Sequence, residues 1–237
     1  MRRITISFVL AVFAISFLSA QDLDKILNDH FKASGQEKIS QITSVSIQGK
    51  IVAMGMESGL SLYQLRPNKL RVEADLMGSK MIQTYNGTTG WIYAPGMGIT
   101  QPQEMGADDL KNIMTQAEMD SPLWDYKAKG KNAELAGMTE DGSAYKIKLT
   151  DASGDVVTIC ISKETSLLSK IIATQNVNGM DTEIETELKD YKDVKGIPTA
   201  HHMSTKMSGQ VVSNISFESV EYNEKLDPSL FEKPVVE

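Results

Sequence analysis

Hydrophobic and polar residues alternate along most of this chain. The alternation is clear in residues 44–53, where Val45, Ile47 and Ile51 are separated by small or polar residues. A period of two is typical of a strand with one buried face. Similar short runs predict further strands at residues 60–62, 70–76, 82–85, 91–93, 145–149, 157–161, 168–172 and 180–188.

Turn-forming pairs such as Asn86-Gly87 and Asp141-Gly142 separate these runs, which predicts hairpins and an antiparallel sheet. Helical spacing of apolar residues predicts helices at 22–34 and 108–119, with a short helical turn over 122–126. A sheet of about ten strands usually curls or closes to protect its edges. We therefore predict a mainly β fold, in which a curved antiparallel sheet forms a half-open, incomplete barrel with a helical lid.

The first residues have the features of a signal peptide. Arg2 and Arg3 precede an apolar run that ends at Ala20 and is too short to span a bilayer. Gln21 follows the expected cleavage site, whereas an acylated bacterial lipoprotein begins with Cys. We expect residues 1–20 to be removed, leaving residues 21–237 as a single periplasmic domain that is not itself lipidated.

Charge and cysteine content narrow the classes of function. The whole chain carries a formal charge of −7, and loss of Arg2 and Arg3 with the signal peptide makes this −9. A chain this acidic is not expected to bind nucleic acid through phosphates. Cys160 is the only cysteine, which excludes an intramolecular disulfide, and its place among apolar strand residues predicts a small buried side chain.

A row of carboxylates marks the run 180–188. Asp181, Glu183, Glu185 and Glu187 occupy its odd positions, and strand side chains two residues apart share a face. Without apolar neighbours that would raise a pKa, this pattern predicts a face in water and not an acid–base site.

No set of residues indicates a reaction. His201 and His202 are adjacent in a late strand and should point to opposite faces, so they cannot hold one metal together, and His30 lies on the first helix. We predict no cofactor, no metal site and no enzymatic activity. A hydrolase of unrecognised type is the least favoured alternative.

Methionine is abundant, with 13 in the whole chain. Its flexible, polarizable side chain suits a surface that accepts acyl chains or varied apolar partners, although for any single methionine a gap-filling place in a core is the better interpretation. The concentration near residues 95–120 favours a mobile apolar lid over that part of the sheet. The methionines singled out along the whole chain are Met54, Met56, Met77, Met81, Met97, Met105, Met114 and Met119, of which the last four lie within residues 95–120.

Five segments together resemble the LolA/LolB-type lipoprotein-sorting and carrier proteins, including their LppX-like relatives. The resemblance rests on the order and spacing of segments 26–38, 65–71, 86–91, 190–198 and 226–234. They include the Pro-x-Lys-x-Arg run after the second strand, the Asn-Gly hairpin before Trp91 and the late Gly-x-Pro turn. One departure is Gln36, which stands where many relatives have a second glycine.

The resemblance implies an incomplete barrel of about eleven strands, in a single domain over residues 21–237, that holds lipid or lipoprotein acyl chains. It further implies a monomeric periplasmic carrier or chaperone for outer-membrane lipoprotein sorting, with a membrane-protein donor or acceptor. A sensor or regulatory module that binds a partner protein is the alternative. An arginine that ties the sheet to the lid would be Arg66 or Arg71, unless both are solvated. The predicted cavity and lid residues are Ile47, Ile51, Leu62, Val72, Ile82, Trp91, Tyr93, Met97, Ile113, Met114, Ile147, Ile159, Ile172, Ile184 and Phe217.

Overall fold

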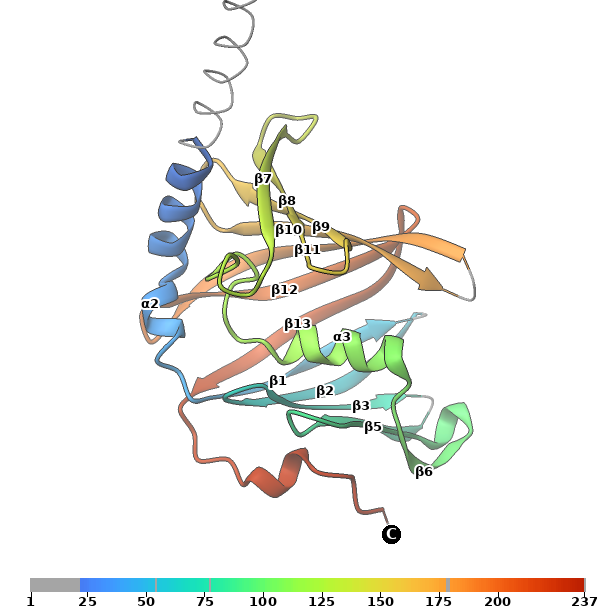
Figure 1. The fold of residues 1–237 in the computed structure, drawn as a ribbon. Coiled ribbons are helices and arrows are strands. Elements are labelled where there is room, and N and C mark those ends of the chain that lie inside the picture. The colour runs from blue at the N-terminus through green and yellow to red at the C-terminus, as the bar shows by residue number, and fades with distance from the viewer. Residues whose placement is uncertain (1–21, 54, 77, 178–179, 237) are drawn as a thin grey trace, which may run out of the picture. The chain divides into compact units, whose positions relative to one another are not determined.

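The computed structural model describes residues 22–53, 55–76, 78–177 and 180–236 (Figure 1). The predicted signal peptide, residues 1–20, lies outside the described residues. Within them, no helix is long and apolar enough to cross a membrane.

Thirteen strands form one sheet in the order β6-β5-β4-β3-β2-β1-β13-β12-β11-β10-β9-β8-β7. The pairings recorded strand by strand are antiparallel. Because β6 and β7 end the order without pairing to each other, the sheet does not close, and the predicted fold class is confirmed. The bounds are β1 Ser44–Ala53, β2 Met56–Leu65, β3 Lys69–Leu76, β4 Ser79–Tyr85, β5 Gly90–Ala94, β6 Ile99–Glu104, β7 Asn132–Met138, β8 Ala144–Thr150, β9 Val156–Ser162, β10 Leu168–Val177, β11 Met180–Val194, β12 Ile197–Met207 and β13 Gln210–Tyr222.

Strands β6 and β7 lie where the sequence did not predict strands, and the sheet has thirteen strands where the family resemblance implied about eleven. Strand β6 occupies part of the segment predicted as a loop, and β7 follows the predicted helical insertion. Pro102 and several exposed polar residues hide the alternation in β6. In β7 a register shift between Leu135 and Met138 interrupts it. Both strands lie at ends of the sheet, where strong alternation is not needed.

Helical material is modest in extent. Residues 22–34 are helical, as predicted, and Gly35 at φ 69° separates them from α2, Gln36–Ile39. The predicted second helix is α3, Ala107–Ala117. The described residues also include two short 3₁₀ helices, η1 over Pro95–Met97 and η2 over Pro228–Phe231. The expected helical turn over 122–126 is instead part of a series of turns over 122–130.

The chain divides into two compact units. The first unit contains the residues up to Ser34 together with Leu123–Glu187, and the second unit contains Gly35–Pro122 together with Leu188–Glu237. Strand β11 belongs to both. The expectation of a single domain over residues 21–237 stays a prediction.

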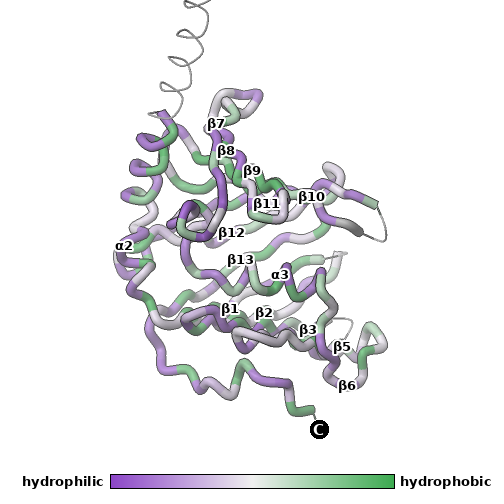
Figure 2. The backbone as a smooth tube through the Cα atoms, viewed as in Figure 1, coloured by the Kyte–Doolittle hydropathy of each residue, from purple (hydrophilic) through white to green (hydrophobic). Residues whose placement is uncertain are grey.

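In the first unit, the helix of residues 22–34 packs on one face of the sheet. Its Leu23, Ile26 and Leu27 join Leu123 and apolar side chains of β7, β8 and β9 in one buried cluster. Strand β9 is among the most hydrophobic stretches of this unit in Figure 2. Burial of this helix face explains why helical spacing was visible in the sequence.

The second unit has two adjoining cores. One gathers Ile42, Val45, Ile47, Ile197 and Val220 around β1, β12 and β13. The other places Ile113 and Ala117 of α3 against Leu70 of β3 and Tyr85 of β4. Helix α3 therefore covers β3 and β4 of its own unit, as expected for a lid helix.

His30 is a buried ionisable group within the first unit. Its side chain is 2% exposed, and Nδ1 donates to the carbonyl oxygen of Ser166 at 2.9 Å. Burial lowers the pKa of His30 from its ordinary value of 6.5, more than the hydrogen bond to Ser166 raises it. The folded protein thus favours the neutral ring.

We expect this burial to make stability fall as pH decreases below 6.5. In that range the unfolded chain binds a proton that the folded chain resists, so protonation favours unfolding. Urea unfolding followed between neutral pH and about pH 5, above the range in which most carboxyl groups titrate, should show the slope. His30→Gln should flatten it, and an unchanged slope in this variant would contradict the prediction.

Candidate binding surface

The strand register of the second unit places six half-buried apolar side chains on one face of its sheet. Ile51 pairs with Ile215, which pairs with Met203, so the three lie side by side across β1, β13 and β12. In β1, residues 47, 49 and 51 point to the same face. Ile47 pairs with Leu62, which pairs with Val72, and Gly49 pairs with Phe217, so these side chains lie on that face as well. We call this surface the apolar patch, and its members are Ile51, Leu62, Val72, Met203, Ile215 and Phe217.

The apolar patch joins the two cores of the second unit. Leu62 packs against both clusters, Val72 packs against the cluster beneath α3, and Phe217 packs against the cluster around β1. Each of these side chains is only partly buried. The patch is therefore anchored on packed residues and still presents apolar surface to its surroundings.

Three predicted cavity residues, Ile82, Trp91 and Tyr93, lie on the face of the sheet opposite to the apolar patch. Ile82 pairs with Glu73 of β3 and with Tyr93 of β5, whereas Val72, the next residue along β3, faces the other side. Trp91 pairs with Thr84, two residues from Ile82, and shares its face. These three residues are thus separated from the patch by the sheet itself.

The predicted cavity residues of the first unit are also divided between the two faces of its sheet. Ile147 and Ile159 pair directly and are both fully buried beneath the helix of residues 22–34. Ile184 shares their face through Ala173 and Val157 and is half-buried. Ile172 pairs with Thr158 and faces the other side. Ile147 and Ile159 are therefore core residues of this unit.

The methionines have several different environments. Met97 is 64% exposed in η1, and Met114 is 48% exposed on α3, whereas Met105 and Met119 pack against the cores. Ile113 of α3 is a core residue. Met54 and Met77 lie outside the described residues. The lid segment thus combines buried and exposed methionines, and its predicted mobility stays a prediction.

Arg66 ties the sheet to the segment that follows α3. Its Nη1 donates to Asp120 Oδ2 at 2.7 Å and its Nη2 to Asp120 Oδ1 at 2.9 Å. The same guanidinium donates to the carbonyl oxygens of Ile42 at 2.7 Å and Ile39 at 3.0 Å. Arg66 is therefore not simply solvated, and a two-point ion pair of this kind is strong and directional.

Gln36 completes this network. Its fully buried amide donates to Asp120 Oδ1 at 2.8 Å and accepts from the backbone N–H of Ser121 at 3.0 Å. Sequence reasoning noted Gln36 as a departure from the family pattern but missed its role and that of Asp120. Arg71, the other arginine considered, instead donates to Glu73 at 2.6 Å and to the carbonyl oxygen of Leu230 at 2.9 Å.

The carboxylate row of β11 is only partly a solvated face. Asp181 and Glu183 are exposed, but the side chains of Glu185 and Glu187 are only 20% and 15% exposed. Lys170 of β10 lies 2.6 Å from Glu185 and 3.7 Å from Glu187. The expectation that the whole row is in water was wrong because the neighbouring strand supplies a cation, and the hydrogen bond to Glu185 raises the pKa of Lys170.

The late histidine pair and the single cysteine lie as predicted. His202 pairs with Ser216, so by alternation His201 points to the opposite face. Cys160 is buried in β9, and burial raises the pKa of its thiol. Among the described residues, no group of three or more His, Cys, Asp or Glu side chains could hold a metal ion.

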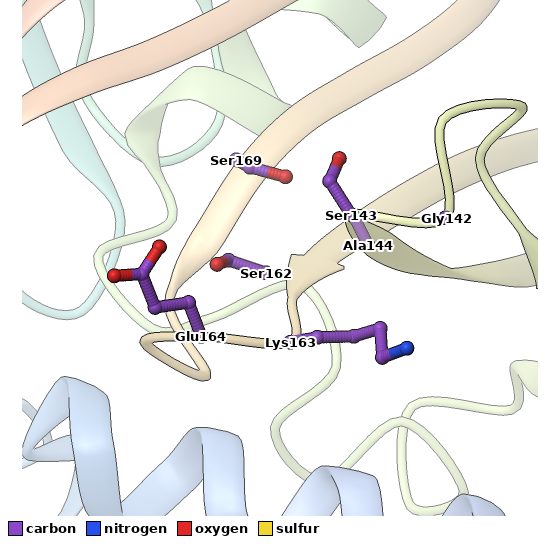
Figure 3. A pocket seen from close by; sticks show the side chains of 7 residues that line it. All are labelled: Gly142, Ser143, Ala144, Ser162, Lys163, Glu164 and Ser169. Carbon is purple, nitrogen blue, oxygen red and sulfur yellow. The ribbon is translucent and has the colours of Figure 1, made fainter.

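A polar hollow of about 460 Å³ lies in the first unit beside the link between β9 and β10. Figure 3 shows its serine side chains together with Lys163 and Glu164. The hydroxyl groups already have partners, since Ser143 donates to Asp141 and Ser169 donates to the carbonyl oxygen of Cys160. The hollow is consistent with a well-bonded turn and does not indicate a ligand.

Comparison with known proteins supports the fold. No protein-family model matches the sequence, and no curated protein matches it either. A DUF1329 family protein from Desulfovibrio piger has a TM-score of 0.59 at 13% identity, over 87% of this chain and 97% of that one. A LolA superfamily protein from Nitrosomonas europaea has a TM-score of 0.55 at 14% identity, over 83% of this chain and 95% of that one. A putative outer membrane lipoprotein-sorting protein domain from Vibrio parahaemolyticus has a TM-score of 0.57 at 8% identity, over 87% and 94%. This chain has the LolA-like fold.

Proposed function

We propose that the protein is a periplasmic carrier of lipid or lipoprotein acyl chains, which bind on the apolar patch. The observation that carries the proposal is the row Ile51–Ile215–Met203, in which three neighbouring strands present half-buried apolar side chains to the same side. Transfer of an acyl chain from water to such a surface is favourable by about 0.8 kcal/mol per buried methylene. The proposal requires no covalent step, no cofactor and no metal.

Two further features support a carrier. The name of the Vibrio parahaemolyticus structure refers to lipoprotein sorting, and its fold is similar to that of this chain. The segment after α3 is fixed to the sheet through Arg66 and Asp120, close in sequence to the helix that covers β3 and β4. Helix α3 covers the part of the sheet beside Leu62 and Val72 of the patch, and a cover there would help to shield a lipid tail from water during transport.

Binding of a fluorescent fatty acid by the mature protein tests the proposal directly. We expect saturable binding by the wild type and about tenfold weaker binding by Ile51→Gln, because a polar amide replaces apolar surface beneath the chain. The matched control is Val52→Gln, since Val52 is the next residue of β1, is also half-buried and faces the opposite side.

The result that contradicts the proposal is equal weakening by both variants, or no binding by the wild type. Native mass spectrometry of protein gently extracted from cells gives a second measurement, in which the carrier should retain lipid. A protein that carries no lipid but binds a protein partner, unaffected by delipidation, would favour the sensor or regulatory module instead.

A further inference from the structure

Exposed apolar side chains gather at the tips of three hairpins of the second unit. Met56 is 47% exposed at the start of β2, Met97 is 64% exposed between β5 and β6, and Val211 is 54% exposed at the start of β13. Val212, beside Val211, is 38% exposed. Single exposed side chains of this kind are ordinary on a protein surface, so the question is whether these lie at one end of the sheet.

The strand register places these tips at one end of the sheet. Ala53 pairs with Met56 on one side and with Ser213, two residues after Val211, on the other, so the β1–β2 and β12–β13 links end together. Strands β1 to β6 are antiparallel neighbours in chain order, so the β5–β6 link is at the same end as the β1–β2 link. Figure 1 shows the β1–β2, β5–β6 and β12–β13 links on the right of the second unit's strands. We call the side chains of Met56, Met97, Val211 and Val212 the apolar tips.

The tips are narrow and separate from one another. Gly55, Gly98 and Gly209 have φ values of 77°, 84° and 78°, which allow tight reversals of the chain. From β13 to β5 there are five strand spacings, or roughly 24 Å along the sheet. A row of isolated apolar points this long does not form a groove for a peptide, but it can meet an extended apolar layer beneath a surface.

Lysines near the apolar tips are paired with glutamates. Lys50 lies 3.1 Å from Glu57, next to Met56, and 3.8 Å from Glu218. Lys80, at the start of β4, lies 2.9 Å from Glu73. Because these lysines already have carboxylate partners, their charge is not available to an anionic headgroup, which favours the neutral headgroups of a zwitterionic bilayer.

We propose that the apolar tips dock this end of the protein onto the surface of a zwitterionic phospholipid bilayer. The tips share no residue with the apolar patch, so the inference does not depend on acyl-chain binding. In this arrangement the side chains insert at the level of the headgroups, and binding strength scales with the apolar area buried there. The protein would thus visit a membrane reversibly, without a spanning helix or a lipid anchor.

Flotation of the mature protein with vesicles of phosphatidylcholine and phosphatidylethanolamine tests the proposal. We expect the wild type to bind and the triple variant Met56→Gln/Met97→Gln/Val211→Gln to partition about tenfold less. Met138→Gln is the matched control because Met138 is 49% exposed but ends β7 in the first unit. Binding should persist at high salt and should not require an anionic lipid.

Several results would overturn the proposal. They are no vesicle binding by the wild type, equal losses in the triple variant and Met138→Gln, or binding that needs anionic lipid and is abolished by salt. If sedimentation shows that the triple variant instead separates a dimer into monomers, the tips contact a second copy and not a bilayer. Thermal unfolding confirms that each variant is folded. Fatty-acid binding by the double variant Met56→Gln/Val211→Gln should be unchanged, because neither residue belongs to the apolar patch or to the predicted cavity and lid residues, and this separates the test from that of the carrier.

Discussion

Replacing Arg66 with methionine is expected to lower the free energy of unfolding by about 3 kcal/mol, because it leaves a partly buried carboxylate without its cation. The guanidinium of Arg66 makes four hydrogen bonds, two to Asp120 and two to backbone carbonyls. The side chains of Arg66 and Asp120 are 26% and 16% exposed, so water replaces only part of what is lost. Urea unfolding of the wild type and Arg66→Met, compared by their midpoints, measures the difference.

Two control variants separate this network from surface electrostatics. Arg66→Lys keeps the charge but loses the planar fork, so it should recover only part of the stability. Lys25→Met removes a cation from the Lys25–Asp29 pair, in which the lysine side chain is 76% exposed, and should have no measurable effect. An Arg66→Met variant as stable as Lys25→Met would contradict the prediction.

A double-mutant cycle tests whether the ion pair is the source of the loss. Asp120→Asn keeps the shape of the side chain and its contact with Gln36 but removes the charge. If Arg66 and Asp120 act together, the double variant should lose much less than the sum of the two single losses. The cycle also shows whether the segment after α3 is held chiefly by this pair or by the amide of Gln36.

The fold could be predicted where each strand keeps one face in a core. Strands β1, β8 and β9 alternate clearly because their apolar residues enter the clusters of their units. Strands β6 and β7 could not be recognised in the same way. A proline in one and a register shift in the other are common at sheet edges, where a strand has one partner and little apolar surface to bury.

The candidate site was harder to predict than the fold because alternation defines faces only within one strand. Ile82 and Val72 are both apolar strand residues, and only the pairing of β3 with β4 shows that they face opposite sides. Ile215 and Met203 were missed, although Ile215 is two residues from the predicted Phe217 and shares its periodicity. Asp120 is separated from Arg66 by 54 residues, so no local pattern could connect them.

Gly49→Ala is expected to lower the free energy of unfolding by about 3 kcal/mol or more, at the upper end of the cost of overpacking. A Cβ atom on Gly49 would overlap the carbonyl oxygen of Ser216 and lie 3.1 Å from Cα of Phe217. Both contacts are with backbone, which cannot rotate away as a side chain can. The overlap occurs where the β1–β13 register shifts between Gln48 and Gly49, so relief would require separating two central strands.

Gly59→Ala provides the matched control, because Gly59 lies in β2 directly opposite Lys50, the residue after Gly49. Its added Cβ would meet only Asp75 Oδ2, at an ordinary 3.8 Å, so its cost should be small. Urea unfolding of both variants decides the matter, and equal stability would contradict the prediction. Because Phe217 belongs to the apolar patch, a shift of β13 in Gly49→Ala should also weaken fatty-acid binding, whereas Gly59→Ala should bind as the wild type does. Loss of stability without loss of binding would show that the strand pairing tolerates displacement there without disturbing the patch.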